Sequence, residues 1–250
     1  MTRSSSSQTI LLAQLDAIFG LHPGFRPAHA KGAMLSGTFA PSPEARSLTR
    51  APHVTRESTP VTVRFSDGTG LPLIPDNLPD ANPRGLAIRF HLADRVHTDI
   101  VSHSTVGFPT RTGQEFRDFL RAAATGDPSA FLATHPAALA FVQTPKPSPA
   151  SFATEAYFGV TAFRFINQQG LARHGRYCIS PKAGVEHLDD AAARRRARTT
   201  CLTNWRAASR QARLSSTSMS KSQMTTTWWM TTPRFIGLAI VPSFISAQSN

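Results

Sequence analysis

Histidines, cysteines and clustered arginines are the residues of this sequence that could carry out chemistry. Histidine exchanges a proton near neutral pH, and the chain contains nine histidines. Taken alone, a histidine beside a loop, such as His29, is usually a surface or capping residue. Cys178 and Cys201 lack CxxC spacing and provide neither a disulfide framework nor a zinc site. The sequence has no phosphate-binding glycine loop, GxSxG motif or metal-spaced His or Cys cluster, so these residue types alone define no enzyme class.

Positive charge is concentrated in the last quarter of the sequence. The formal net charge is +12 at pH 7, but no Asp or Glu follows Asp190. Nine Arg and Lys do follow it, so residues 191–250 carry +9 and residues 1–190 the remaining +3. An arginine run in this segment could contact the phosphates of a nucleic acid, which is one interpretation of the sequence. Its members are Arg194, Arg195, Arg196 and Arg198.

The elements that must position a site follow from the hydrophobic periodicity. A helix is expected at residues 9–19, and helical spacing of apolar residues predicts two or three short helices within residues 113–142. Alternating β-branched and aromatic residues predict strands elsewhere. Strands followed by helices and then by strands indicate an α+β domain. The expected strands lie at residues 34–39, 61–66, 84–92, 98–103, 157–167 and 175–181.

Five segments, in order and at similar spacing, resemble the catalase superfamily, and in particular its short branch of catalase-related peroxidases. The resemblance covers roughly residues 15–190. It implies an α+β fold, a catalase-like antiparallel β-barrel with flanking helices, incomplete at the C-terminus, and heme b as cofactor. The segments are RPAHAKG (Arg26–Gly32), VTVRFSDGTG (Val61–Gly70), NPRGLAIRFHL (Asn82–Leu92), DIVSHSTVGFPTRTGQEF (Asp99–Phe116), and SFATEAYFGVTAFRFINQQG (Ser151–Gly170) followed by GRYCISP (Gly175–Pro181).

The resemblance assigns the acid–base chemistry to His29. In that family a distal histidine lies above the heme iron, takes a proton from one peroxide oxygen and returns it to the other, so that water leaves. Imidazole suits this role because its unperturbed pKa is near neutrality. Ser66 matches the family's serine beside the distal histidine, where its hydroxyl can orient the ring. Without the resemblance, Ser66 before Asp67-Gly68 would be read as a turn former.

Three further residues are assigned to the cofactor side by the resemblance. Arg26 and Arg64 match arginines that face the heme propionates, a role suited to a guanidinium because it stays charged and forks onto carboxylates. Phe108 matches the phenylalanine that packs on the porphyrin face. By default Arg64 would be a solvated strand residue and Phe108 a core residue.

Position 103 departs from the large catalases, which have an asparagine where this sequence has His103. An asparagine donates a hydrogen bond without titrating, whereas a histidine donates or accepts according to its protonation state and tautomer. We therefore place His103 among the catalytic residues. The substitution favours peroxidase activity with an organic reductant over catalase turnover.

No residue is identified as a metal ligand. In the family a tyrosine on a late helix holds the iron, with an arginine one turn before it that keeps the phenol ionised. The only tyrosines here, Tyr157 and Tyr177, belong to the predicted middle strands, and nothing after Asp190 resembles the family. The proximal tyrosine is thus missing from this chain, and we expect weak or no activity.

The codons of the tail permit a test of its reading frame. Trp and Met have single codons, so Trp228-Trp229-Met230-Thr231 is encoded by TGGTGGATGACN. Read one base earlier, the same DNA gives Val, Asp and Asp, which restores the acids that the tail lacks. We therefore hypothesise that residues from about Arg194 onward are translated out of frame, and that the basic, Ser-, Thr- and Trp-rich segment 191–250 is not a family domain.

We interpret residues 1–190 as the N-terminal and central part of a heme-dependent peroxidase or catalase-type oxidoreductase acting on hydrogen peroxide or organic hydroperoxides. Peroxide and a small-molecule reductant would be its partners; neither a membrane nor nucleic acid is expected, and a homo-oligomer is left open. The cysteine spacing and the polar N-terminus favour the cytoplasm. Two alternatives remain, a basic nucleic-acid-binding protein and a catalase-fold binding module without heme.

Overall fold

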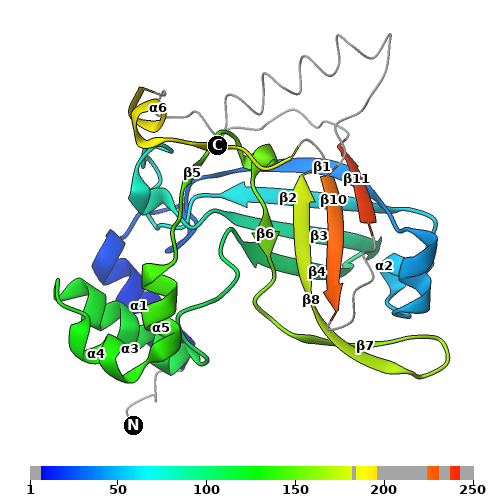
Figure 1. The fold of residues 1–250 in the computed structure, drawn as a ribbon, viewed down its shortest axis with the longest axis horizontal. Coiled ribbons are helices and arrows are strands. Elements are labelled where there is room, and N and C mark those ends of the chain that lie inside the picture. Colours follow the sequence, from blue (N-terminus) through cyan, green and yellow to red (C-terminus); the bar gives the residue numbers. More distant parts are fainter. Residues whose placement is uncertain (1–6, 182–183, 196–223, 231–236, 243–250) are drawn as a thin grey trace.

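The computed structural model describes residues 7–181, 184–195, 224–230 and 237–242. It contains a large antiparallel sheet with short helices around it (Figure 1). The helices are α1 (Ser7–Phe19), α2 (Pro52–Thr55), α3 (Gly113–Ala124), α4 (Ser129–Thr134), α5 (Pro136–Gln143) and α6 (Asp190–Arg195). The strands are β1 (Gly32–Ala40), β2 (Thr59–Ser66), β3 (Gly85–Ala93), β4 (Val96–His103), β5 (Ser148–Pro149), β6 (Tyr157–Phe158), β7 (Phe163–Ile166), β8 (Ala172–Pro181), β9 (His187–Leu188), β10 (Met224–Met230) and β11 (Gly237–Pro242).

The strand pairing in the described residues forms a closed ring. Antiparallel pairs run from β1 through β2, β3, β4, β6, β8, β10 and β11, and β11 pairs again with β1. The short strand β7 pairs with β8, and β5 and β9 form a separate two-stranded sheet. The α+β fold and the antiparallel barrel with flanking helices that the sequence predicts are therefore present (Figure 1).

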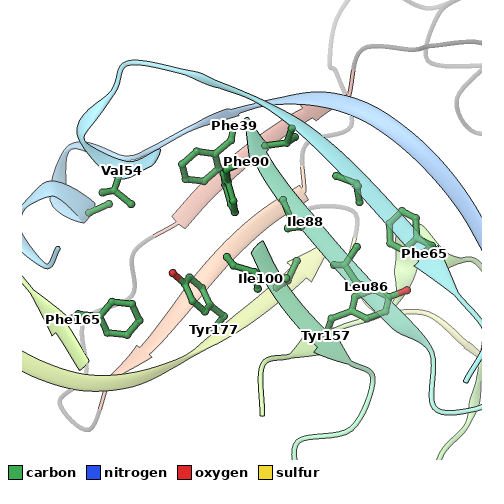
Figure 2. Packing of buried hydrophobic residues seen from close by; sticks show 14 of the residues in the cluster. Phe39, Val54, Phe65, Leu86, Ile88, Phe90, Ile100, Tyr157, Phe165 and Tyr177 are labelled. Atoms are coloured by element: carbon green, nitrogen blue, oxygen red, sulfur yellow. The ribbon is translucent and has the colours of Figure 1, made fainter. Parts of the chain in front are cut away.

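Alternation along the central strands separates the barrel core from its outer face. Leu86, Ile88 and Phe90 of β3 are each 1% exposed and pack inside the barrel with Phe39 and Phe65 (Figure 2). Each such fully buried side chain stabilises the fold by roughly 1.5–3 kcal/mol. Since successive side chains of a strand point to opposite faces, the residues between these core positions lie on the outer face.

The helices α1, α3, α4 and α5 gather at one end of the barrel (Figure 1). Thr112 caps α3 by accepting a hydrogen bond from the backbone N–H of Glu115 at 3.1 Å. Arg121 of α3 donates to Gln14 of α1 at 3.1 Å, which joins the first helix to the third. The predicted helix at residues 9–19 and the predicted short helices within residues 113–142 are confirmed.

None of the helices in the described ranges is long and apolar enough to cross a bilayer.

Two segments differ in detail from the predicted elements. The expected strand at residues 157–167 is divided into β6 and β7, because the register against β8 changes between them: the chain advances five residues from Phe158 to Phe163, whereas β8 advances three from Cys178 to Gly175. Backbone of the basic tail forms β10 and β11, while Arg196 and Arg198 lie outside the described residues. The domain boundary at residue 190 and the reading frame of the tail stay predictions.

Candidate active site

The strand register brings three of the predicted site positions to one end of the barrel's outer face. Ser66, the last residue of β2, pairs with Gly85 at the start of β3, and Gly85 pairs with His103 at the end of β4. On the other side Ser66 pairs with Gly32, the first residue of β1. His29 lies three residues before this strand, so the loop that leads into β1 carries it to the same end. Residues far apart in the sequence thus meet in one row.

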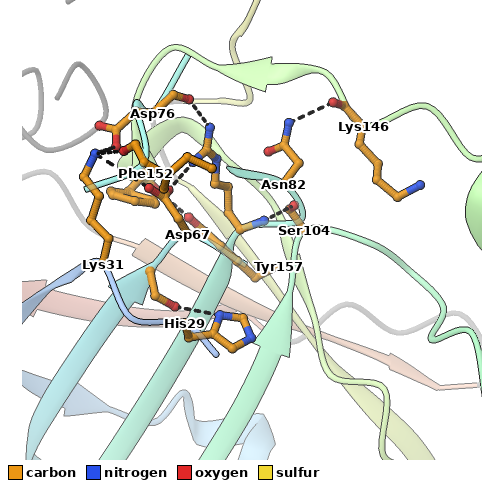
Figure 3. A network of polar contacts seen from close by, with 12 residues as sticks. His29, Lys31, Asp67, Asp76, Asn82, Ser104, Lys146, Phe152 and Tyr157 are labelled. Atoms are coloured by element: carbon orange, nitrogen blue, oxygen red, sulfur yellow. Dashed lines mark hydrogen bonds and ion pairs between the residues drawn. The ribbon is translucent and has the colours of Figure 1, made fainter. Parts of the chain in front are cut away.

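His29 is held directly by Ser66. Its Nδ1 lies 3.0 Å from Ser66 Oγ (Figure 3), so the hydroxyl fixes the plane of the ring, while the donor depends on the tautomer. The backbone of His29 has a φ of 55°, the left-handed conformation that non-glycine residues seldom adopt. Such a conformation persists only where the surroundings impose it, and it is most frequent at functional sites.

The environment of His29 keeps its imidazole neutral. Burial is the main cause that lowers its pKa to about 4, and the nearby charges of His103 and Arg64 lower it further. A hydrogen bond with the backbone of Asp67 acts in the opposite direction but does not compensate. At neutral pH the ring is therefore unprotonated and can accept a proton from a bound substrate.

His103 faces His29 across the site. The two ring centroids lie 5.4 Å apart and the planes are inclined by 41°. Nδ1 of His103 is buried and has no hydrogen-bond partner within the described part of the chain, and burial lowers the pKa of this ring. Phe108 lies on its other side, with ring centroids 6.1 Å apart. His103 is thus a second neutral imidazole that can exchange a hydrogen bond with a ligand.

Arg64 and Arg26 place positive charge beside the two histidines. Arg64 Nη2 donates to the carbonyl oxygen of His29 at 2.6 Å, which ties the loop to β2. Burial, and then repulsion from Arg26, lowers the pKa of Arg64 to about 10. Arg26 is exposed, so both guanidinium groups lie at an edge of the site that solvent reaches. Two neighbouring cations of this kind suit a ligand with carboxylate groups.

A strip of mainly apolar side chains runs along the outer face next to the histidines. Met34 and Val101 are each 61% exposed, and the register places them at the two ends of one cross-strand row, with Arg64 and Ala87 between them. Exposed apolar side chains in a row on one face indicate a surface that a ligand covers. A flat apolar macrocycle with carboxylates at its rim, such as heme, fits this combination of apolar strip and arginine pair.

Sequence reasoning missed two features of this site. Gly85 makes room for His29, because a Cβ there would lie 2.9 Å from His29 Nδ1 and 2.7 Å from Ser66 Oγ. Met34 and Val101 were not identified either. Their signal is visible in the sequence as apolar residues at the outward positions of predicted strands.

The structure offers no candidate for a phenolate ligand. Tyr157 is fully buried and donates from its hydroxyl to the carbonyl of Phe152 at 2.9 Å. Tyr177 is 6% exposed, and burial raises its pKa far above the neutral range. Among the described residues, no group of three His, Cys, Asp or Glu side chains is placed to hold a metal ion.

The fold and the site together define a catalase-like β-barrel protein with its polar cluster on the barrel's outer face. The family model described as Catalase matches residues 24–204, so the chain belongs to the catalase family.

Curated relatives agree with this assignment. A catalase-related peroxidase from Mycolicibacterium paratuberculosis is 37% identical over 183 residues, which cover 70% of this chain and 58% of that protein. A second, from Synechococcus elongatus, is 33% identical over 193 residues, covering 72% and 56%. The chain thus spans a little more than half the length of these relatives.

Among solved structures, catalase A from Saccharomyces cerevisiae superposes with a TM-score of 0.74 at 18% identity. The superposition covers 94% of this chain and 55% of catalase A. A fungal catalase gives a TM-score of 0.70 at 19% identity, covering 92% of this chain and 52% of that one. These similarities confirm the catalase fold.

Proposed function

We propose that the protein is by descent a heme-dependent peroxidase, which binds heme b on the outer face of its barrel and reduces hydrogen peroxide or an organic hydroperoxide weakly or not at all, because both tyrosines are buried in the barrel strands. The observation that carries the proposal is the neutral, oriented imidazole of His29 beside His103, next to an apolar strip and two arginines. The names of the curated relatives, catalase-related peroxidases, support it.

Different residues would bind the heme and transfer the proton. Met34 and Val101 would contact the macrocycle, and Arg64 and Arg26 would pair with its propionates. Heme, when bound, supplies the two-electron redox chemistry, and the electrons come from a small-molecule reductant.

His29 performs the proton transfer. Its unprotonated nitrogen accepts the peroxide proton and returns it to the oxygen that leaves, so one product is water or an alcohol rather than an anion. Ser66 keeps the ring in one orientation during both steps. His103 would hold the second peroxide oxygen by a hydrogen bond from its ring. We also propose a cytoplasmic location, on the spacing of the two cysteines.

The test is a titration of the purified chain with ferric heme b, followed in the Soret and visible bands. We expect saturable binding in the parent chain and a changed spectrum in His29→Ala, whereas the exposed His97→Ala on β4 serves as the matched control and leaves the spectrum unchanged. Consumption of hydrogen peroxide with a chromogenic phenol as reductant then measures activity. Absence of saturable binding would overturn the proposal and favour a binding module without heme. Retention on DNA that falls steeply with salt would favour the nucleic-acid alternative.

A further inference from the structure

Four charged side chains form a buried cluster directly behind the candidate site (Figure 3). The side chains of Asp67, Asp76 and Arg84 are fully buried, and that of Lys31 is 10% exposed. Lys31 pairs with Asp76, lies 3.8 Å from Asp67 Oδ2 and donates to the carbonyl of Ile74 at 2.6 Å. Arg84 pairs with Asp67 and also donates to the backbone carbonyl of Asp76. The cluster holds two cationic groups and two carboxyl groups in contact, and burial raises the pKa of the Asp67 carboxyl to about 7 although Arg84 and Lys31 act in the opposite direction.

Members of the cluster are neighbours in sequence of the site residues. Asp67 directly follows Ser66, and Lys31 lies two residues after His29. The backbone N–H of Asp67 donates to the carbonyl of Lys31 at 3.1 Å, so the histidine loop and the serine are joined by backbone as well as by charge. A shift of either charged residue would displace its site neighbour, since consecutive Cα atoms are fixed about 3.8 Å apart.

The cluster also adjoins the site residues at the start of β3 and at the end of β4. Arg84 directly precedes Gly85, the residue that makes room for the His29 ring. The backbone of Arg84 is bound to Ser104 in both directions: its N–H donates to Ser104 Oγ at 2.9 Å, and its carbonyl accepts from the N–H of Ser104 at 2.8 Å. Ser104 directly follows His103. The position of each site residue is therefore linked to this one cluster.

The conformation of His29 requires such support. A left-handed backbone is unfavourable for a non-glycine residue, so the loop would relax if its anchors were removed. Besides Arg64 on the His29 carbonyl, the anchors are the N–H of Ala30, which donates to Thr69 at 3.0 Å, and the ion pairs of Lys31.

Stability alone does not account for this cluster. Taking charged groups out of water is costly, and replacing a buried ion pair with well-packed apolar residues is often neutral or stabilising. Buried ionic groups do, however, fix one arrangement of the chain, because a charge left without its partner is strongly unfavourable. A cluster that adjoins every member of the His29–Ser66–Gly85–His103 row is suited to that role.

We propose that Lys31, Asp67, Asp76 and Arg84 are positioning residues that set the orientation and burial of His29. The inference rests on the proposed role of His29 as the acid–base residue, but its structural content can be measured without heme or peroxide. Loss of the cluster would allow the loop to relax, admit water to the imidazole and remove the burial that depresses its pKa.

The test measures the pKa of His29 by NMR in the full chain without heme, with His29→Gln used to assign the ring signal. Lys31→Met removes the charge at nearly constant length, and Asp76→Asn keeps the shape of the carboxyl group without its charge. We expect either change to raise the pKa of His29 from about 4 towards 6.5, by about one unit or more. Lys31→Arg, which keeps the charge, should leave the pKa close to that of the parent.

Asn167→Ala is the matched control. Asn167 is 8% exposed, donates to the carbonyl of Ser47 at 3.1 Å and accepts from the N–H groups of Gln169 and Leu171, so the variant also removes a buried polar group, but one whose partners lie outside the cluster. We expect it to lower the midpoint of thermal unfolding without changing the titration of His29. If Lys31→Met does not fold, the pKa of His29 is compared between Asp76→Asn, which removes a charge from the cluster, and Lys31→Arg, which keeps it.

Two results would overturn the proposal: an unchanged His29 pKa in the folded cluster variants, or an equal change in Asn167→Ala. A failed heme titration would overturn the proposed function, but the positioning role of the cluster would still be tested by the NMR titration of His29, which needs no heme. The two claims can therefore fail separately.

Discussion

A methyl group on residue 85 would lie 2.9 Å from Nδ1 of His29, a distance that real Cβ atoms essentially never show. The same atom would approach the hydroxyl of Ser66 to 2.7 Å, so it would enter the space between the two bonded groups. Gly85→Ala should therefore separate His29 from Ser66 and destabilise the protein by about 1–3 kcal/mol, the usual cost of overpacking.

Urea unfolding and the heme titration measure the effect of Gly85→Ala, and we expect both stability and heme affinity to fall. Gly107→Ala is the control, because a Cβ at Gly107 meets no atom within 4 Å and the residue has no left-handed backbone. Equal behaviour of the two variants would show that residue 85 does not shape the site.

The hydroxyl of Ser66 should affect catalysis more than its small size suggests. Ser66→Ala removes the only hydrogen bond to another side chain that the structure gives the His29 ring within the described residues, at a cost of about 1 kcal/mol in stability. General acid–base catalysis contributes about 100-fold or more, so we expect His29→Ala to abolish whatever weak peroxide reduction the parent chain shows. Ser66→Ala, which keeps the base but loosens it, should lose about tenfold.

Ser102→Ala provides the comparison for Ser66→Ala in steady-state assays. Ser102 is 1% exposed and donates to the carbonyl of Leu86 at 2.8 Å, so its removal costs similar stability. It belongs to the barrel wall rather than to the site, and activity should persist. A loss of activity in Ser102→Ala equal to that in Ser66→Ala would assign the effect to stability alone.

The elements of this fold could be predicted from local patterns because the patterns reflect burial. On β3 the apolar residues Leu86, Ile88 and Phe90 alternate with Ala87 and Arg89, and the barrel buries the first set. The resemblance supplied the barrel and the histidine, since neither follows from alternation alone. The break between β6 and β7 shows the limit, because it depends on a change of register against β8, and no local pattern in the sequence records that register.

The positioning cluster was not predictable from sequence. Lys31 and Asp76 are separated by 45 residues, and each looks locally like an ordinary loop charge. Only the register of β1, β2 and β3 brings them behind Ser66. For the tail, composition shows that residues 191–250 are unusual, but the reading frame stays a prediction that the coding DNA tests. If the neighbouring frame held no family-like sequence, the frame hypothesis would be abandoned.

Substitutions of Arg26 and Arg64 should distinguish heme binding from the positioning of His29. Arg26 is exposed, and for it the structure gives only a charge interaction with Arg64 and His29. Arg26→Gln should change stability by less than about 0.5 kcal/mol and weaken heme binding several-fold. Arg64→Gln should weaken binding too, and in addition raise the pKa of His29, because Arg64 both holds the His29 carbonyl and repels a proton from its ring.

Heme titrations at low and high salt, with histidine NMR, compare the two arginine variants. Salt should weaken binding to the parent more than binding to either variant. If neither substitution altered heme affinity, the arginines would not face the propionates.

His53 should make the fold sensitive to acid. Its ring is 4% exposed, stacks on Phe90 with centroids 4.4 Å apart, contacts Phe39, and has two nitrogens with no partner in the described residues. Burial lowers its pKa from 6.5 to about 4. Between these values the unfolded chain binds the proton more readily, so the stability from His53 is complete above pH 6.5 and is lost as the pH falls towards 4.

His53→Leu isolates this contribution, because every other titrating group is common to both proteins. A shift of this size corresponds to roughly 3 kcal/mol, at about 1.4 kcal/mol per pKa unit. Relative to the parent, the variant should therefore gain up to that amount as the pH is lowered from 7.5 to 4, with most of the gain between pH 6 and 4. Urea unfolding across this range measures the difference. A constant difference would mean that the buried imidazole takes up its proton without unfolding the chain, because its nitrogens reach water.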